Sequence, residues 1–294
     1  MTNVSSPELL ETDVDLVLPR PQPAARSSPR WIGLRGPEPA RSERILSVLS
    51  PLLLLCAWEI AARLHVIDAR FFPAPSSIAL AMLNMLQPTP EFPGGELETH
   101  IAISLRRLAI GFTLGAVPGV IIGALMGLFS PIRALIQPLI DGTFPIPKIA
   151  VLPLFIMVFG IGEESKYAII MAAVIYLVLI NTAAGVRNIE RIYFDVGKNF
   201  RASWLMMFTD VAVPGALPHI MTGLKLGMGV ALLVIVSAEF VGAHSGVGYV
   251  IWTSWQVFQV EKMYVGLVCI AVIGFVSAVL LHWLERVLVP WKRD

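Results

Sequence analysis

Residues 108–128 read LAIGFTLGAVPGVIIGALMGL and contain no charged side chain. A membrane-crossing helix needs about 20 consecutive, mostly apolar residues, so this stretch can cross a bilayer. Glycines recur at every fourth position within it, at Gly111, Gly115, Gly119, Gly123 and Gly127. Residues spaced by four share one helix face, and a face without side chains lets another helix approach closely. The stretch therefore predicts a membrane helix in a tightly packed helical bundle.

The composition of the whole chain agrees with this prediction. Of 294 residues, 56% are hydrophobic and only 15% are charged, and the mean hydropathy is +0.73. Soluble domains carry about 25% charged residues, so the chain has more apolar side chains than one soluble core can bury. The fold class is therefore an all-α, multi-pass membrane protein. The net charge of +1 gives no indication of a nucleic-acid partner.

Six stretches have the length and composition of membrane spans, and prolines interrupt the third of them. These are residues 45–64, 101–129, 133–159, 166–186, 217–241 and 263–289. Lysine and arginine concentrate in the loops on one side, which predicts that both termini are cytoplasmic. Residues 1–44 are rich in proline, arginine and serine and are expected to form a disordered tail. Residues 45–294 would form the membrane domain.

The sequence lacks the motifs of an enzyme or a metalloprotein. It contains neither a phosphate-cradling Gly-rich loop nor a Gly-x-Ser-x-Gly nucleophile motif. Its five histidines are scattered, and Cys56 and Cys269 lie far apart in apolar runs. We therefore expect no catalytic residue, metal site or cofactor on this chain.

Ionisable residues inside predicted spans are costly to bury and are functional candidates for that reason. Lys148 lies in the proline-rich third span, and Glu239 lies at the end of the fifth. Lys148 could attract an anion in a polar pathway, and Glu239 could fix a gate or pair with a cation. The alternative for both is an internal ion pair or a side chain that reaches the headgroups.

The connection between the fourth and fifth spans, about residues 187–216, is longer and more apolar than an ordinary loop. It carries aromatic side chains among charged ones, including Phe194, Phe200, Trp204 and Phe208. This spacing suits short amphipathic helices that lie on the cytoplasmic surface and offer aromatic anchors to a soluble partner. A helix that rests on the membrane interface is the alternative.

Several short pieces of the sequence occur in a characteristic order. They are FPAPS (72–76), SLRRL (104–108), PIPKIA (145–150), FGIGE (159–163), NTAAGVR (181–187), PGALP (214–218) and SGVGY (245–249). In these pieces the chain resembles the permease subunit of a bacterial ATP-binding-cassette importer of the nitrate, sulfonate and taurine branch. The resemblance covers residues 45–291, and it adds Asn181 to Lys148 and Glu239 as a substrate-pathway candidate.

The resemblance implies a type I importer permease in the inner membrane, working by alternating access. It implies a homodimer, two cytoplasmic ATPase subunits that hold the ATP and magnesium, and an extracytoplasmic solute-binding protein. The expected substrate is a small anion such as nitrate, a sulfonate, taurine or bicarbonate, although aromatic or heterocyclic organic molecules also fall within the family. An ion-coupled secondary transporter that works without an ATPase is the alternative, and a membrane-embedded enzyme is a weaker one.

The permeases of this family carry a Glu-Ala-Ala motif, a later glycine and an Ile/Val-x-Leu-Pro segment in the ATPase-coupling loop. Counting back from Pro214 puts the acid on Asp195, the second alanine on Gly197 and the glycine on Arg201. An arginine with positive φ would be strained where glycine is free to adopt it. Together with the anchors Phe200 and Trp204, these residues are the predicted ATPase contacts.

Overall fold

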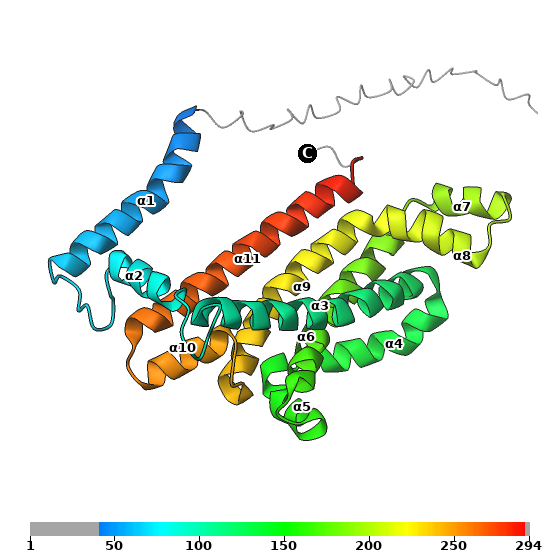
Figure 1. Cartoon of the computed structure of the whole chain (residues 1–294). Helices are drawn as coiled ribbons and strands as arrows, with labels where there is room; N and C mark the ends of the chain where they lie inside the picture. Colours follow the sequence, from blue (N-terminus) through cyan, green and yellow to red (C-terminus); the bar gives the residue numbers. More distant parts are fainter. Residues whose placement is uncertain (1–40, 292–294) are drawn as a thin grey trace, which may run out of the picture. The chain divides into compact units, whose positions relative to one another are not determined.

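The computed structural model describes residues 41–291, and every secondary-structure element in that range is helical (Figure 1). In chain order the elements are α1 (Arg41–Arg63), α2 (Pro75–Met85), α3 (Glu96–Leu128), α4 (Ser130–Thr143), the 3₁₀-helix η1 (Lys148–Val151), α5 (Leu152–Phe159), α6 (Glu163–Arg187), α7 (Arg191–Asn199), α8 (Trp204–Met206), the π-helix η2 (Met207–Ala212), α9 (Val213–Gly242), α10 (Val247–Gln256) and α11 (Val260–Leu288). Contacts within the chain separate residues 1–54 from residues 55–294. Most of the predicted tail, residues 1–40, lies outside the described residues.

Four described helices are long and apolar enough to cross a membrane: α3, α6, α11 and the continuous helix Trp204–Gly242. The bent pair of α4 with η1 and α5 makes a fifth if it is counted as one span. These helices match the second to sixth predicted stretches. Helix α1 covers the first stretch, and the number of six spans stays a prediction.

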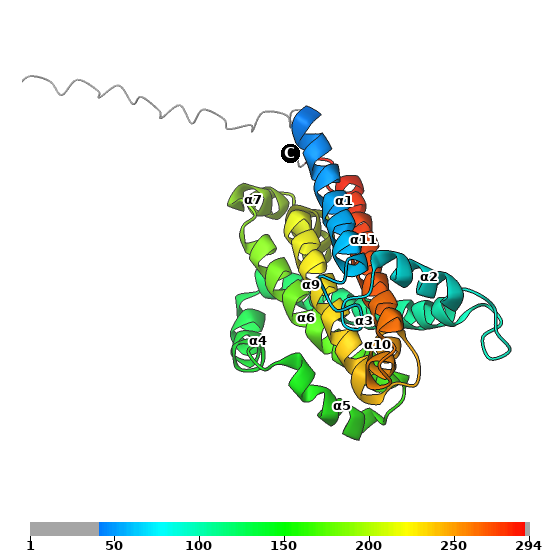
Figure 2. The ribbon, with the colours of Figure 1, turned by 90° about the vertical axis from the view of Figure 1, so that its left-hand side faces the viewer.

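Helix α6 is the centre of the bundle, with α3 packed on one face and α9 on another (Figure 2). The predicted glycine face of α3 makes this contact. A Cβ atom added at Gly115 would lie 2.7 Å from the Met171 carbonyl oxygen, and one at Gly123 would lie 2.6 Å from that of Leu179. Helix α9 approaches α6 in the same way at Gly223. The prediction that these glycines serve helix packing is confirmed.

The third predicted span is broken rather than straight. Helix α4 ends at Thr143, and η1 with α5 continues at an angle of 89° to it. Pro145 and Pro147 occupy the break, and proline has no backbone N–H with which to continue a helix. The prolines of the sequence therefore mark the position of this break.

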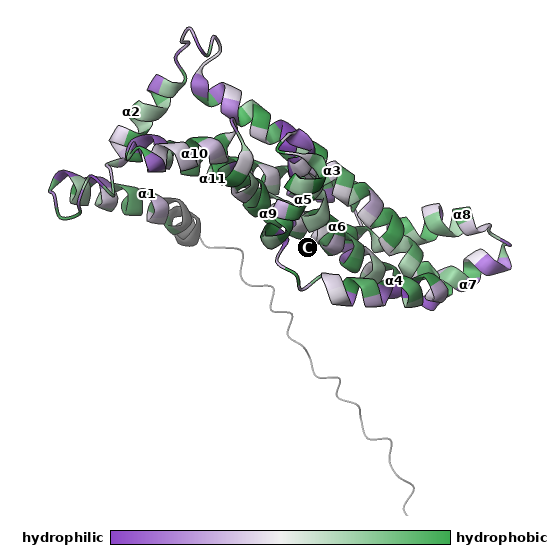
Figure 3. Cartoon of the chain, turned by 90° about the horizontal axis from the view of Figure 1, so that it is seen from below, coloured by the Kyte–Doolittle hydropathy of each residue, from purple (hydrophilic) through white to green (hydrophobic). Residues whose placement is uncertain are grey.

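The sequence predicted short surface helices over residues 187–216. The structure has one separate short helix there, and much of the rest belongs to a longer helix. Helix α7 is separate, but α8 runs through η2 into α9 without interruption, so that Trp204–Gly242 is one helix of 39 residues. Pro214 has no backbone N–H to donate within this helix, and it directly follows the π-helix η2, where the α-helical hydrogen-bond pattern is already altered. Hydrophilic residues gather around α7, whereas apolar residues cover much of α3, α6 and α9 (Figure 3).

Candidate functional site

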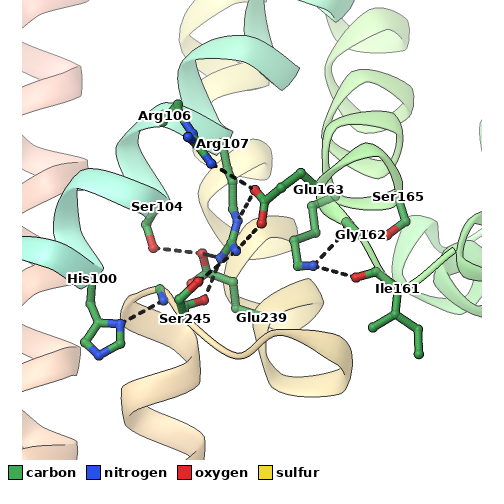
Figure 4. A network of polar contacts seen from close by, with 12 residues as sticks. His100, Ser104, Arg106, Arg107, Ile161, Gly162, Glu163, Ser165, Glu239 and Ser245 are labelled. Carbon is green, nitrogen blue, oxygen red and sulfur yellow. Dashed lines mark hydrogen bonds and ion pairs between the residues drawn. The ribbon is translucent and has the colours of Figure 1, made fainter. Parts of the chain in front are cut away.

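A cluster of charged and polar residues joins four helices at one end of the bundle (Figure 4). We call it the Arg107 cluster; its members are His100, Ser104, Arg107, Glu163, Glu239 and Ser245. Arg107, on α3, is 1% exposed and pairs with two carboxylates. Its Nη2 lies 2.5 Å from Oε1 of Glu163 on α6, and its Nη1 lies 2.8 Å from Oε1 of Glu239 on α9. One cation therefore holds three helices together.

Glu239 is as deeply buried as Arg107, and both of its oxygens accept hydrogen bonds. The Ser104 hydroxyl donates to Oε1 at 2.8 Å, and the backbone N–H of Gly248 donates to Oε2 at 2.8 Å. A buried charge is tolerated when it is paired and its remaining lone pairs are hydrogen-bonded. The sequence had left a gate and an internal ion pair open for Glu239, and the structure shows the ion pair.

The cluster also holds the start of α10. The first backbone N–H groups of a helix have no partner within it. Here the N–H of Gly246 donates to Nδ1 of His100 at 3.0 Å, and that of Val247 donates to the Ser104 hydroxyl at 2.8 Å. Arg107 donates to the carbonyl oxygen of Ser245 at 2.6 Å. Side chains of α3 and α9 therefore fix the turn between α9 and α10.

Lys148 lies at the break between α4 and α5, away from the Arg107 cluster. Its Nζ donates to the carbonyl oxygens of Thr143, Phe144 and Ile146 at 2.9, 3.2 and 3.1 Å. It also lies 4.3 Å from the ring centroid of Tyr176 on α6. An ammonium group has three N–H donors, so these carbonyls use its full capacity. In this conformation Lys148 caps the broken span.

Asn181 lies in the C-terminal third of α6, in a third environment. Its amide donates to the carbonyl oxygen of Leu177 one turn earlier, at 2.7 Å. A Cβ atom added at Gly223 would lie 3.0 Å from the Cβ of Asn181, so the residue is part of the contact between α6 and α9. The three predicted pathway residues are thus spread over the bundle and do not form one cluster.

The predicted coupling residues lie on three neighbouring elements: Asp195 and Gly197 are in α7, Phe200 and Arg201 in the turn after it, Trp204 begins α8, and Pro214 is at the start of α9. Phe200 and Trp204 are 84% and 64% exposed, whereas the neighbouring Phe194 and Phe208 pack against a buried core of α6 and α9. Asp195 is exposed on α7 and lies 4.0 Å from Lys198. At Gly197 a Cβ atom would collide with the sulfur of Met207, so glycine permits the close contact between α7 and η2.

The end of α7 explains the residue at position 201. Arg201 has φ +53°. Its N–H donates to the carbonyl oxygen of Lys198, and the N–H of Ala202 donates to that of Gly197, both at 2.9 Å. This pair of bonds is the Schellman ending of a helix, which places a left-handed residue, usually glycine, one position after the residue that caps the helix, here Phe200. The backbone therefore has the shape that glycine favours, with an arginine in it.

Comparison with known proteins places this geometry in a family. The model of the binding-protein-dependent transport system inner membrane component family matches residues 119–294. The chain belongs to this family. It is 34% identical to a protein named as an aliphatic sulfonates transport permease, SsuC, of Bacillus subtilis (strain 168), over 84% of this chain and 87% of that protein.

Two other relatives belong to the same branch. The taurine transport system permease protein TauC of Escherichia coli (strain K12) is 32% identical, over 87% of this chain and 93% of the relative. The nitrate import permease protein NrtB of Leptolyngbya laminosa is 29% identical, over 65% and 68%. The chain is therefore a permease component of an ATP-binding-cassette importer in the nitrate, sulfonate and taurine branch, and a multi-pass inner-membrane protein. The predicted family is confirmed.

Sequence reasoning missed most of the Arg107 cluster. It singled out Glu239 but not the other members of the cluster, which are His100, Ser104, Arg107, Glu163 and Ser245. These residues stand in three of the quoted motif pieces, SLRRL, FGIGE and SGVGY, or just before the first of them. The available signal was that each piece carries a polar side chain next to an apolar span. Arg107 and Glu239 are 132 positions apart, so only the fold brings them together.

Proposed function

We propose that this permease forms the translocation pathway of an ATP-driven importer and moves a small anionic solute by alternating access. A solute-binding protein outside would deliver the solute, and two cytoplasmic ATPase subunits would supply the energy to a homodimer of this chain. The names of the relatives support an anion of the sulfonate, taurine or nitrate type. ATP and magnesium would bind the ATPase and not this chain.

The topology that we propose has six spans and both termini in the cytoplasm, with residues 1–44 as a cytoplasmic tail and 45–294 as the permease domain. Helix α1 would be the first span, and the bent pair of α4 and α5 the third. The excess of lysine and arginine around α7 and after α11 supports this orientation. Helix α7 is then cytoplasmic, and the Arg107 cluster lies near the outer surface.

The observation that carries the proposal is the exposed α7–α8 segment at the end of a long continuous helix. Its Schellman turn occurs where the family motif has its glycine, and Phe200 next to that turn is almost fully exposed. An aromatic anchor of this kind fits a groove on a soluble partner. Asp195, Gly197, Arg201 and Pro214 would shape the segment, and Phe200 and Trp204 would contact the ATPase.

The same helix offers a route for the motion. Trp204 and Glu239 lie on one uninterrupted helix, about 50 Å apart at 1.5 Å per residue. When ATP closes the ATPase dimer, displacement at α7 and α8 would tilt this helix, and Pro218 and η2 are the positions where it can bend. Movement at the cytoplasmic end would then reach the Arg107 cluster and the turn before α10.

The pathway candidates stay Lys148, Asn181 and Glu239. In the conformation described, the charged groups of Lys148 and Glu239 and the amide nitrogen of Asn181 are already hydrogen-bonded within the chain. Contact with a solute would therefore need a second conformation in which some of these bonds open. Alternating access supplies such a conformation.

The decisive experiment combines Phe200→Ala with Trp204→Ala in the assembled transporter. We expect weaker ATPase binding and loss of solute-stimulated hydrolysis, because truncating a central anchor costs about 2 kcal/mol or more. The matched control combines Trp255→Ala in α10 with Phe258→Ala just after it, because these two side chains are also exposed, at 54% and 78%. Cysteines at positions 200 and 204 should also crosslink to the ATPase.

Two outcomes would contradict the proposal. In one, the Phe200/Trp204 variant keeps solute-stimulated hydrolysis and crosslinks only to lipid. In the other, the chain catalyses uptake in vesicles that contain no ATPase subunit, which would favour an ion-coupled transporter.

A further inference from the structure

Helix α7 has two faces that border two different hollows. Ile192, Val196 and Phe200 line a groove of about 1000 Å³ whose charged side chains, Glu190 and Asp210, are both acidic. The opposite face of α7 carries Arg191, Asp195 and Lys198, at the spacing of one helix face. These residues line a second hollow of about 720 Å³, which we call the basic cavity.

The basic cavity collects positive charge from two helices. Arg187 at the end of α6 joins Arg191 and Lys198 in its wall, and Asp195 is the acidic residue among its lining side chains. Two positive charges therefore remain in excess. The Asp195–Lys198 pair is long, 4.0 Å, and both side chains are exposed, so it neutralises little.

The arginines of the cavity keep most of their hydrogen-bonding capacity. Arg187 uses Nε for a bond of 3.3 Å to the carbonyl oxygen of Ala183, which leaves its two terminal nitrogens. Within residues 41–291 the Arg191 guanidinium makes no hydrogen bond or ion pair. Like charges that line one hollow repel one another, and an anion bound between them would reduce this repulsion. Guanidinium donors match the oxygens of phosphate and of similar oxyanions.

We propose that the basic cavity binds a tetrahedral oxyanion, of phosphate or sulfonate type, through Arg187, Arg191 and Lys198. Phe194 and Trp204 line the same cavity and give an attached organic group an apolar wall. A volume of this size lies in the range of small-ligand sites. The anion can come from solution or from the headgroup of a phospholipid, because both present the same group to the arginines.

Occupancy of the basic cavity would act on α7 from the side opposite to Phe200. An anion that links Arg187 on α6 to Arg191 and Lys198 on α7 would hold α7 against the end of the span. This regulatory consequence rests on the proposed coupling role of α7. The binding itself does not, so the two can fail separately.

The binding test uses the purified full chain. In detergent, inorganic phosphate and methanesulfonate are titrated by calorimetry. In nanodiscs, retention of phosphatidylglycerol over phosphatidylcholine is measured by mass spectrometry. The test variant combines Arg187→Gln with Arg191→Gln, and the matched control is Arg286→Gln, an exposed arginine near the end of α11. Loss of two charge-assisted contacts should weaken binding about tenfold or more.

A second variant tests the sign of the effect without removing any positive charge. Asp195→Asn takes the negative charge out of the cavity wall and should tighten binding, which no folding defect would imitate. Binding of the soluble anions that is lost in the double variant supports a soluble ligand. Lipid retention that is lost in the double variant, without soluble binding, supports a headgroup.

The proposal is overturned if the double variant and Arg286→Gln behave alike in both measurements. It is also overturned if Asp195→Asn weakens binding. A separate measurement, ATPase stimulation in the assembled transporter with and without phosphate or phosphatidylglycerol, tests the regulatory step. Binding without any effect on hydrolysis would leave the site in place and remove its link to coupling.

Discussion

The two ends of the helix Trp204–Gly242 lie in opposite environments. Near its last turn Glu239 is 1% exposed and bonded to Arg107, Ser104 and the start of α10. At its first turn Trp204 is 64% exposed, and the adjoining turn places Arg201 at φ +53°. One end is held by buried charge pairs, and the other offers apolar side chains and a strained residue to the surroundings.

This difference fits a helix that transmits movement. Segments that move or bind partners have few buried contacts and exposed apolar groups, whereas anchoring regions bury and satisfy their polar groups. A displacement applied at the α7–α8 segment meets resistance at the Arg107 cluster, so the helix can act as a lever. The comparison predicts large stability effects at the cluster and small ones near α7.

The largest effect is expected for Arg107→Met. It leaves Glu239 buried without its cation, and breaking a buried pair costs about 3–5 kcal/mol. Thermal unfolding of the purified chain in detergent should show a large loss of stability, with low membrane yield. Arg106→Met is the matched control, because Arg106 is 59% exposed and 3.7 Å from Glu163.

A second variant keeps this prediction testable if Arg107→Met does not fold. Combining Arg107→Met with Glu239→Met removes both buried charges and should recover part of the loss. If Arg107→Met unfolds at the same temperature as Arg106→Met, the cluster is not the anchor of α9.

The packing of α3 on α6 should be the next most sensitive feature. Gly123→Leu places side-chain atoms where the Leu179 carbonyl and the Cβ of Thr182 lie within 2.8 Å of an added Cβ. Backbone atoms cannot move aside easily, so we expect the free energy of unfolding to fall by about 1–3 kcal/mol or more. Gly142→Leu is the control, since an added Cβ there meets nothing within 4 Å. Equal unfolding temperatures would show that the glycine face is not a tight interface.

The sequence predicted these two regions unequally, for physical reasons. An apolar run and a four-residue period are local, so the spans and the glycine face could be read directly. The partners of Glu239 could not, because a charged residue next to a span does not reveal which of several others it will meet. The continuity of α8, η2 and α9 was missed because a proline usually ends a helix, whereas Pro214 directly follows the π-helix η2 and Pro218 lies inside α9.

Lys148→Met should have an intermediate effect. The three carbonyl oxygens that Lys148 bonds at the break would lose their hydrogen-bond donor. The free energy of unfolding should therefore fall by about 1–2 kcal/mol. We expect lower maximal uptake, because the ammonium caps the break in the conformation described, and an unchanged half-saturation concentration if that is its only role. Lys262→Met, which removes a partly exposed lysine paired with Glu96, is the control. A raised half-saturation concentration with unchanged stability would instead make Lys148 a ligand of the solute.

The smallest effect, and the only stabilising one, is expected for Arg201→Gly. A left-handed conformation costs a non-glycine residue about 1–2 kcal/mol of stability, which Arg201→Gly would recover. Glycine also gives the unfolded chain more conformational freedom, and this offsets about 0.4–1 kcal/mol of the gain. The net gain should be about 0.5–1 kcal/mol, measured as a small rise in the unfolding temperature.

The control for this last prediction separates backbone strain from charge. Arg201→Ala removes the guanidinium but keeps a Cβ at positive φ, so it should give no gain in stability. Because the Schellman bonds of Lys198 and Gly197 define the end of α7, relief of strain there should leave the segment in place and hydrolysis should stay coupled to uptake. If both variants stabilise equally, the charge of Arg201 and not its φ angle is the unfavourable feature. If Arg201→Gly uncouples hydrolysis from uptake, the backbone strain at Arg201 is needed to hold Phe200 in position. The α7–α8 segment would then be rigid although its side chains are exposed.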